Sequence, residues 1–242
     1  MTALLILSGA ACVAWGLILL PVLAEHYSVQ RIAPRVISGQ GFDAALLESA
    51  VLKGSRSSDV CHPPALNAVA IIRLRQYETV NAGAERKLTS EAINTLRESV
   101  HAALSCSPTL PFLWFLKYWL EVVENGFSAK ALEYLRMSYK LGPNEGWISA
   151  LRNRFSLAVY DQLPEDLAAR VVPEFVSLVR SGFYAQAASN LSGPGWQKRE
   201  VLLAALAPLT ERRRYEFAKH LRAGGIYVDI PGLISPPRRP WN

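Results

Sequence analysis

The sequence contains few of the residues on which most catalytic and metal sites depend. It has three cysteines and four histidines in 242 residues, with no CxxC pair, no HExxH motif and no zinc-finger spacing. A glycine-rich phosphate loop and a GxSxG nucleophile turn are also missing from the sequence. These absences exclude the enzyme classes that such motifs identify. We therefore expect a non-enzymatic protein with no cofactor and no metal.

Patterns typical of β-sheets and of nucleic-acid binding are also scarce. No long run alternates apolar with polar residues, and at most residues 226–229 are expected to pair locally. There is no RNP-type aromatic strand and no basic heptad region. The net charge is +6, but basic and acidic residues are interspersed, as on an ordinary solvated surface; anionic lipid or acidic polysaccharide is the alternative partner. We expect an all-α protein that does not bind nucleic acid.

Charged residues are absent from the first 24 positions. Thr2 to Ala24 is an apolar run that would be about 34 Å long as a helix, enough to cross a bilayer. Val22 and Ala24 have the spacing of a signal-peptidase site, yet no Lys or Arg precedes the run, so we favour a retained transmembrane anchor. Residues 25–41 are polar and punctuated by Gly and Pro, which predicts a linker.

Capping and breaking residues divide the remainder into predicted helices. Asp43 is expected to cap the first helix and Gly54 to end it, and Pro63 suits the first turn of the next. Pro173 is expected to break or kink a later helix. Together these helices predict a helical-repeat domain over 42–225 and a Pro-rich tail over 226–242. The predicted helices cover residues 42–53, 63–77, 90–106, 111–124, a segment opening at 128, 147–160, 164–180, 184–191, 201–207 and 211–222.

One spacing of residues, four then three then five, occurs twice. The two quartets are Leu96, Val100, Ala103 and Pro108, then Ala131, Leu135, Ser138 and Pro143. Because 35 residues separate each member of the first quartet from its partner, the pattern resembles the second helix of the tetratricopeptide repeat. Tyr118 departs from the pattern, since it stands where the family has a small residue. The resemblance implies a solenoid of antiparallel helical hairpins.

A longer run also resembles a group of known proteins. Residues 131–154, with Leu135-Arg136-Met137-Ser138 and Gly142-Pro143-Asn144-Glu145, resemble membrane-anchored helical-repeat proteins of bacterial polysaccharide-biosynthesis systems. The resemblance implies a scaffold or accessory protein in exopolysaccharide biosynthesis or export, with membrane-embedded protein partners and polysaccharide as a possible ligand. Two alternatives stay open: an accessory subunit of another integral-membrane complex, and a glycan-processing enzyme.

The most aromatic stretch is residues 111–124. Its side chains fall into two stripes, one with Trp114 and Tyr118, so we expect this helix to be covered on most sides by core packing. The alternative is that one stripe lines a groove and presents ring faces to a sugar or a peptide. The candidate binding residues are Trp114, Tyr118, Trp147 and Arg152.

Two constellations are weak candidates for chemistry. Glu121 and Glu124 are three residues apart on one helix, as a paired acid and base would be, although surface carboxylates are far commoner at this spacing. His62 and His101, together with the neighbouring cysteines, form a conceivable metal set, but the spacing matches no standard zinc module. We therefore predict neither a catalytic nor a metal site.

Cys61 and Cys106 are the candidates for a disulfide. Their midpoint falls in the loop predicted to join two antiparallel helices, so the second helix returns Cys106 to the level of Cys61. A disulfide forms in an oxidising compartment, which predicts a periplasmic domain on an inner-membrane protein with a single spanning helix. Arg31 and Arg35 follow the apolar run, and the positive-inside rule favours the alternative, a cytoplasmic domain.

Overall fold

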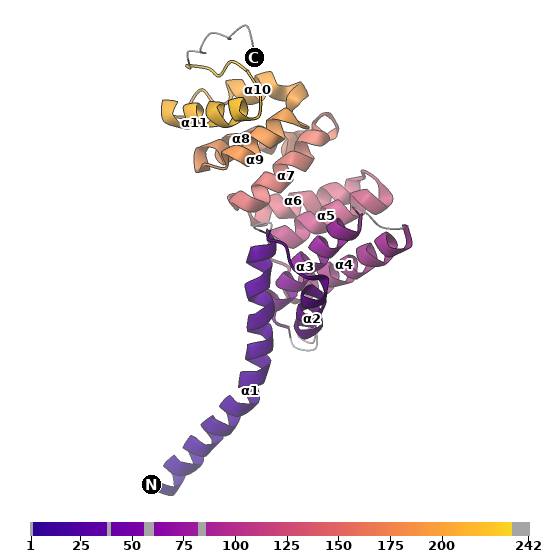
Figure 1. The fold of residues 1–242 in the computed structure, drawn as a ribbon, viewed down its shortest axis with the longest axis vertical. Coiled ribbons are helices and arrows are strands. Elements are labelled where there is room, and N and C mark those ends of the chain that lie inside the picture. The colour runs from indigo at the N-terminus through magenta and orange to yellow at the C-terminus, as the bar shows by residue number, and fades with distance from the viewer. Residues whose placement is uncertain (1, 38–39, 56–60, 82–85, 234–242) are drawn as a thin grey trace. The chain divides into compact units, whose positions relative to one another are not determined.

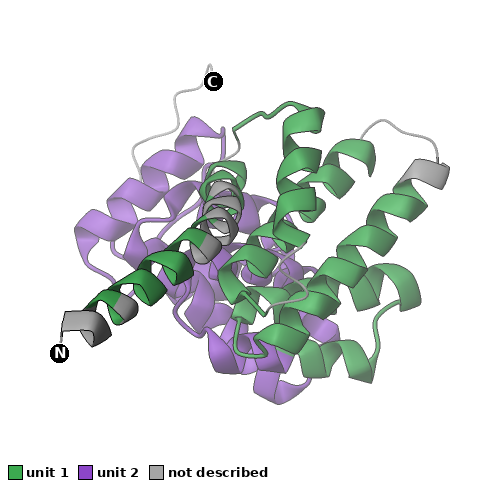
Figure 2. Ribbon diagram, turned by 90° about the horizontal axis from the view of Figure 1, so that it is seen from below, with its two compact units in different colours: residues 1–135 green, residues 136–242 purple. Residues whose placement is uncertain are grey.

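The computed structural model describes residues 2–37, 40–55, 61–81 and 86–233. Every regular element in these ranges is a helix and none is a strand, which confirms the all-α prediction (Figure 1). The chain divides into two compact units, residues 1–135 and 136–242 (Figure 2). The boundary falls within helix α6, Ala129–Leu141, so the sequence predicts one repeat domain where the structure has two units.

Helix α1, Thr2–Ile37, is longer than the sequence suggested. The linker predicted from residue 25 is helical up to Ile37, because Val29, Ala33 and Val36 form an apolar stripe at helical spacing that is buried against the rest of unit 1. This tertiary contact outweighs the polar residues between them. The linker prediction is therefore wrong for residues 25–37.

The earlier part of α1 has a different environment. Its described apolar side chains, among them Val13, Trp15 and Leu17, are about two-thirds exposed. Among the described residues, no helix has an apolar stretch long enough for a bilayer crossing. Within α1, the side chains left undescribed are those of residues 2–5, 7, 18–19, 21–26 and 28.

Gly54 does not end the first predicted helix. Helix α2, Ala44–Ser55, begins after Asp43, whose Oδ1 accepts a hydrogen bond from the Ala45 amide at 3.3 Å, and it continues through Gly54. A Cβ at Gly54 would lie 2.5 Å from Cγ2 of Val69 and 3.2 Å from Cγ2 of Val29. The glycine is therefore required by the close approach of three helices.

The remaining helices of unit 1 follow the predicted punctuation. They are α3, Pro63–Asn81; α4, Arg86–Cys106; α5, Pro111–Asn125; and the first part of α6. Ser128 caps α6 by accepting a hydrogen bond from the Ala131 amide at 3.2 Å. The helical members of both quartets, Leu96, Val100, Ala103, Ala131, Leu135 and Ser138, are all buried. The repeat positions thus face the interior, while a tetratricopeptide arrangement stays a prediction.

Unit 2 is built from short helices around an apolar core. After the end of α6 it contains α7, Gly146–Ala158; η2, Tyr160–Gln162; α8, Glu165–Ser181; α9, Tyr184–Ser192; η3, Trp196–Lys198; α10, Arg199–Ala204; and α11, Glu211–Ala223. Phe175 and Phe217 meet edge to face in this core, with ring centroids 5.9 Å apart. Helix α8 ends at Gly182, which has φ +87° and adopts the left-handed conformation that favours glycine.

Two predictions for unit 2 can be compared with the structure. Helix α8 is not broken at Pro173, because the side chain is exposed and the carbonyl that lacks a donor belongs to exposed Ala169, where water can satisfy it. Residues 226–229 form no strand. The segment instead leads to buried Ile230 and to Pro231, whose carbonyl accepts a hydrogen bond from Arg214 Nη1 at 2.6 Å. Of the Pro-rich tail, residues 234–242 lie outside the described residues.

Candidate ligand-binding site

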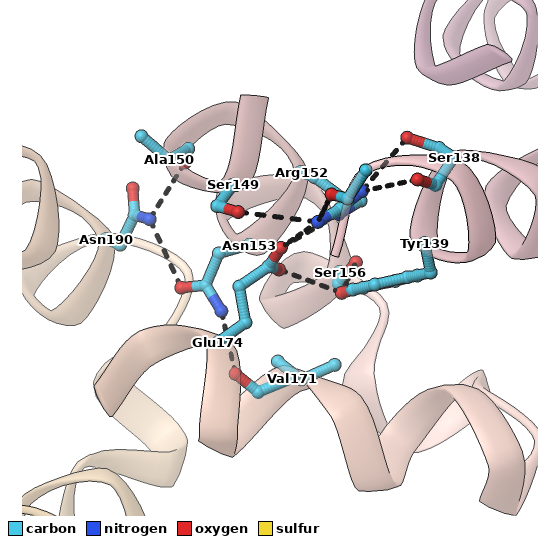
Figure 3. Close-up of polar contacts among 11 residues, drawn as sticks. Ser138, Tyr139, Ser149, Ala150, Arg152, Asn153, Ser156, Val171, Glu174 and Asn190 are labelled. Atoms are coloured by element: carbon cyan, nitrogen blue, oxygen red, sulfur yellow. Dashed lines mark hydrogen bonds and ion pairs between the residues drawn. The ribbon is translucent and has the colours of Figure 1, made fainter. Parts of the chain in front are cut away.

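Arg152 is the centre of a buried polar network in unit 2 and is itself fully buried (Figure 3). Its Nε donates to Glu174 Oε1 at 2.8 Å, and its Nη1 donates to the Ser138 carbonyl at 2.9 Å. Its Nη2 donates to the Gly142 carbonyl at 3.1 Å and to Glu174. Every nitrogen of the guanidinium therefore has a partner, and Arg152 offers no group to an external ligand.

Glu174 and Tyr139 complete the network. The Tyr139 hydroxyl donates to Glu174 Oε2 at 2.9 Å, and the Arg152 guanidinium lies 4.0 Å from the Tyr139 ring centroid. Burial raises the pKa of Glu174 above its usual value, while the charge of Arg152 acts in the opposite direction. Burial, and then the charge of Glu174, raise the pKa of Tyr139. The network thus joins α6, α7 and α8 through an ion pair that is shielded from water.

Two buried asparagines extend these connections to α9. Asn153 Nδ2 donates to the Val171 carbonyl at 2.8 Å. Asn190 Nδ2 donates to the Ala150 carbonyl at 3.0 Å and to Asn153 Oδ1 at 3.2 Å. Because hydrogen bonds are directional, these contacts specify how α7, α8 and α9 align along one another.

Asn190 also fixes the turn that follows α9. The Gly195 amide donates to the Asn190 carbonyl at 2.8 Å, and a Cβ at Gly195 would lie 2.8 Å from that oxygen. Only glycine fits this approach without displacement of the backbone. The ends of α7 and α9, and the short helices η2 and η3 that follow them, are therefore held in a defined arrangement.

Those two chain segments line an open cavity of about 690 Å³. It lies within unit 2 and combines two aromatic rings with polar side chains of both donor and acceptor type. The side chains that matter for binding are Tyr160, Asp161, Gln162, Trp196, Gln197 and Lys198. A volume of this size is typical of ligand pockets, which hold roughly 300–1,000 Å³. We take this cavity as the candidate site.

Charge within the cavity is balanced. Lys198 Nζ forms an ion pair with Asp161 Oδ1 at 2.5 Å and lies 5.2 Å from the centroid of the Tyr160 ring. Outside the cavity lining, the Arg199 guanidinium lies 4.9 Å from the Trp196 ring centroid. Each ring thus has a cation beside it, and the only two charged groups that line the cavity neutralise one another.

The candidate residues of the aromatic helix differ from one another in exposure. Tyr118 is buried, and burial raises its pKa to about 12. Trp114 is half-buried; its Nε1 donates to the Pro108 carbonyl at 2.7 Å, and its ring lies 6.0 Å from that of Tyr134. Lys117 Nζ lies 5.3 Å from the Trp114 ring and 4.7 Å from the Tyr134 ring. The half-exposed cluster is therefore Trp114, Lys117 and Tyr134, with Tyr118 in the core.

The four candidate binding residues do not form one group. Trp114 and Tyr118 belong to unit 1, whereas Trp147 and Arg152 belong to unit 2. Trp147 is half-buried, and Arg152 is enclosed by the polar network. None of the four lines the cavity of unit 2.

Glu121 and Glu124 are each held by a different basic residue. Lys130 Nζ lies 2.9 Å from Glu121 Oε2, and Arg97 forms a two-pronged contact with Glu124. The Lys130 hydrogen bond lowers the pKa of Glu121, whereas a general acid at neutral pH needs a raised pKa. The arrangement is that of two surface ion pairs.

Cys61 and Cys106 are joined by a disulfide that links the start of α3 to the end of α4, with their Cα atoms 5.3 Å apart. Their sulfurs therefore offer no thiolate to a metal. Close by, His62 Nδ1 accepts a hydrogen bond from the Ala65 amide at 3.3 Å and so caps α3. The described residues contain no cluster of three or more potential metal ligands.

No protein family, curated protein or solved structure matches this chain.

The sequence interpretation missed Tyr160 and Trp196, the two rings of the cavity. Tyr160 is the last residue of the helix predicted over 147–160, Trp196 follows the helix predicted over 184–191, and 36 residues separate the two positions. An aromatic residue beside a Gly-Pro-Gly turn is a weak local signal for exposure at a bend. Nothing in the local pattern, however, shows that the two bends meet.

Proposed function

We propose that this protein is a non-enzymatic, membrane-attached helical scaffold that serves bacterial exopolysaccharide biosynthesis or export, with both units on the periplasmic side. The observation that carries the compartment is the bond between Cys61 and Cys106. Structural disulfides persist in oxidising compartments and are rare in the cytosol. For a bacterial inner-membrane protein, the oxidising side is the periplasm.

The proposed attachment to the membrane rests on the apolar character of residues 2–24. Described side chains in this run, including Val13, Trp15 and Leu17, are about two-thirds exposed. A large exposed apolar surface requires a partner, and the bilayer is the partner we assign. Attachment would confine both units near membrane-embedded enzymes and so raise their effective concentration there.

The proposed system rests on the resemblance of residues 131–154 to helical-repeat proteins of polysaccharide biosynthesis. The cavity of unit 2 adds independent support, because it combines aromatic rings with uncharged hydrogen-bonding groups, the chemistry that recognises sugars. The half-exposed cluster of Trp114, Lys117 and Tyr134 offers a second aromatic surface for a protein or glycan partner.

Thiol labelling of intact cells tests the compartment. Protein denatured in the presence of an alkylating reagent is expected to leave Cys61 and Cys106 unmodified until a reductant is added. Cys12, which is a free cysteine, serves as the internal control for labelling after denaturation. Modification of all three cysteines without reductant would place the domain in the cytoplasm and contradict the proposal.

Affinity purification from crosslinked, detergent-solubilised membranes tests the system. We expect polysaccharide polymerases, glycosyltransferases or export components to be recovered with the full-length chain. In parallel, a strain without the protein is expected to secrete less exopolysaccharide. If the recovered partners belong to an unrelated membrane complex and the strain without the protein secretes normal amounts of exopolysaccharide, the alternative is favoured: an accessory subunit of another complex.

A further inference from the structure

The cavity between the turns that follow α7 and α9 has the features of a binding site with a defined ligand class. Its volume of about 690 Å³ exceeds that of the other described cavities of unit 2, about 320 and 290 Å³. Both of its walls lie in unit 2, so its shape does not depend on any partner. The ligand class follows from the groups that line it.

Aromatic ring faces are the first of these groups. Trp196 is 40% exposed although it is one of the largest apolar side chains, and Tyr160, which lines the same cavity, is half-buried. The face of an aromatic ring carries partial negative charge and attracts C–H groups that carry partial positive charge. The apolar face of a pyranose ring presents such C–H groups, so the face of each ring that Lys198 or Arg199 does not cover suits a sugar.

Uncharged hydrogen-bonding side chains are the second kind of group that lines the cavity. Gln162 and Gln197 are exposed at the cavity, and each amide carries both a donor and an acceptor. A sugar hydroxyl also donates and accepts hydrogen bonds, so two neighbouring hydroxyls can bond to the NH₂ and the oxygen of one amide. Asp161 keeps acceptor capacity after its ion pair with Lys198, because a carboxylate has about four lone-pair sites.

The charges within the lining balance, and the Arg199 guanidinium just outside it, beside Trp196, has Glu200 as its own ion-pair partner at 3.8 Å, so the site favours a neutral ligand over a strongly ionic one. Lys198 and Asp161 neutralise each other, so neither a phosphate nor a uronate finds an uncompensated cation within the lining. An anion would have to break this ion pair before it could bind. A neutral glycan requires no such cost.

The walls are also held in place before any ligand arrives. The buried pair Asn153 and Asn190 aligns α7 with α9, and the Gly195 amide is bonded to the Asn190 carbonyl. Preformed walls reduce the loss of conformational entropy on binding. The polar network of unit 2 therefore acts as the support of the cavity.

We infer that this cavity is a subsite for a neutral oligosaccharide, with Trp196 and Tyr160 as stacking surfaces and Gln162, Gln197 and Asp161 as hydroxyl partners. The origin of the glycan rests on the proposed role in polysaccharide assembly. The binding chemistry itself stands on the groups that line the cavity.

Saturation-transfer NMR with the purified full-length protein in detergent tests this assignment. The probes are cellohexaose, maltohexaose, mannohexaose and the anionic hexagalacturonate. At least one neutral hexasaccharide is expected to receive saturation from the protein and to bind at least tenfold more tightly than hexagalacturonate. Binding of none of the neutral probes, or a preference for hexagalacturonate, would overturn the assignment.

Single substitutions locate the binding. Trp196→Ala and Gln197→Ala are expected to weaken neutral-glycan binding at least tenfold and about threefold, respectively. Tyr215→Ala removes an exposed aromatic ring from α11, outside the cavity lining, and is expected to leave binding unchanged. Circular dichroism and thermal unfolding of each variant show that the fold is kept, and Gln197→Ala tests the site even if Trp196→Ala unfolds.

The assignment and the proposed function can fail separately. A Trp196→Ala protein that still recovers its membrane partners but binds no glycan supports the subsite and leaves the scaffold intact. Loss of glycan binding in Tyr215→Ala as well as in Trp196→Ala would show that binding lies elsewhere and would refute the subsite. Recovery of unrelated partners together with Trp196-dependent binding would refute only the role in polysaccharide assembly.

Discussion

The two units are stabilised by different means. All seven buried polar or charged residues among those described belong to unit 2: Ser138, Ser149, Arg152, Asn153, Ser156, Glu174 and Asn190. The described interior of unit 1 is apolar, and a disulfide joins two of its helices. Apolar burial stabilises without direction, so it tolerates small shifts of one helix along another. In unit 1 a covalent bond and hydrogen bonds that are at least partly open to solvent, such as those from Arg73 to Glu48, hold the helices in register, whereas in unit 2 fully buried hydrogen bonds do so.

The candidate cavity lies in unit 2. The helices of unit 2 are short, with two turns held at fixed positions, and the cavity lies at those turns. Unit 1 has longer helices whose ends are joined by the disulfide. The buried polar contacts are therefore concentrated in the unit that contains the candidate cavity.

Removal of the disulfide is expected to have the largest effect. In the variant Cys61→Ser with Cys106→Ser, the loss of a link across 45 residues should lower the free energy of unfolding of unit 1 by about 4 kcal/mol, because the unfolded chain regains freedom. Urea unfolding followed by hydrogen exchange measures this in α3 and α4. Cys12→Ser is the matched control and should change nothing. An equal loss of protection in unit 2 would show that the units do not behave independently.

Loss of the buried ion pair between Arg152 and Glu174 is expected to have the second-largest effect on stability. Glu174→Gln keeps the shape of the side chain but leaves the charge of Arg152 buried without a counter-charge, which should destabilise unit 2 by about 3 kcal/mol. Chemical unfolding with exchange detection in α7 and α8 checks the value. Asp166→Asn makes the same chemical change at the exposed pair with Arg136, and it should cost under about 1 kcal/mol. Similar losses for the two variants would contradict the role assigned to burial.

Loss of the hydrogen bonds made by the pair Asn153 and Asn190 should destabilise unit 2 less than loss of the ion pair. Asn190→Ala leaves the Ala150 carbonyl and Asn153 Oδ1 without their donor in a buried position, at a cost of about 2 kcal/mol. Thermal unfolding measures the loss, and glycan binding should weaken in parallel because the walls of the cavity are less well held. Gln186→Ala, at an exposed position on the same helix, is the control and should have no effect. Destabilisation without any change in binding would separate the network from the cavity.

The smallest effect concerns the exposed pair of Arg136 and Asp166. The Arg136 guanidinium lowers the pKa of Asp166 below its usual 3.8, so the pair stabilises the fold above that pH and the contribution is lost as pH falls through the lowered pKa. Arg136→Ala should cost about 0.5 kcal/mol at pH 7. Unfolding measured from pH 7 down to pH 2 should show the variant and the parent converging. If the difference in unfolding free energy between Arg136→Ala and the parent grew as the pH fell, the predicted direction of the pH dependence would be wrong.

Much of the helical structure was predictable because its signals are local. Pro63 and Pro111 begin helices, Ser128 caps one and Gly182 ends one, and each acts through residues within a single turn. The hairpin predicted from the sequence likewise places Cys61 and Cys106 at the same level, where the structure joins them by a disulfide. Such inferences need only chain direction and helix length.

The tertiary structure alone decided the rest. Gly54 carries the local signal of a helix end, yet packing against Val29 and Val69 keeps it inside α2. Arg152 has the sequence features of a surface residue, but Glu174, 22 positions away, neutralises it in the interior. The sequence by itself determined most of the helical segments, because hydrogen bonds and caps act over a few residues, whereas the helix over residues 25–37 depends on the packing of Val29, Ala33 and Val36. Only the folded chain decided which side chains share an interior or a cavity, because those contacts join residues that no local pattern relates.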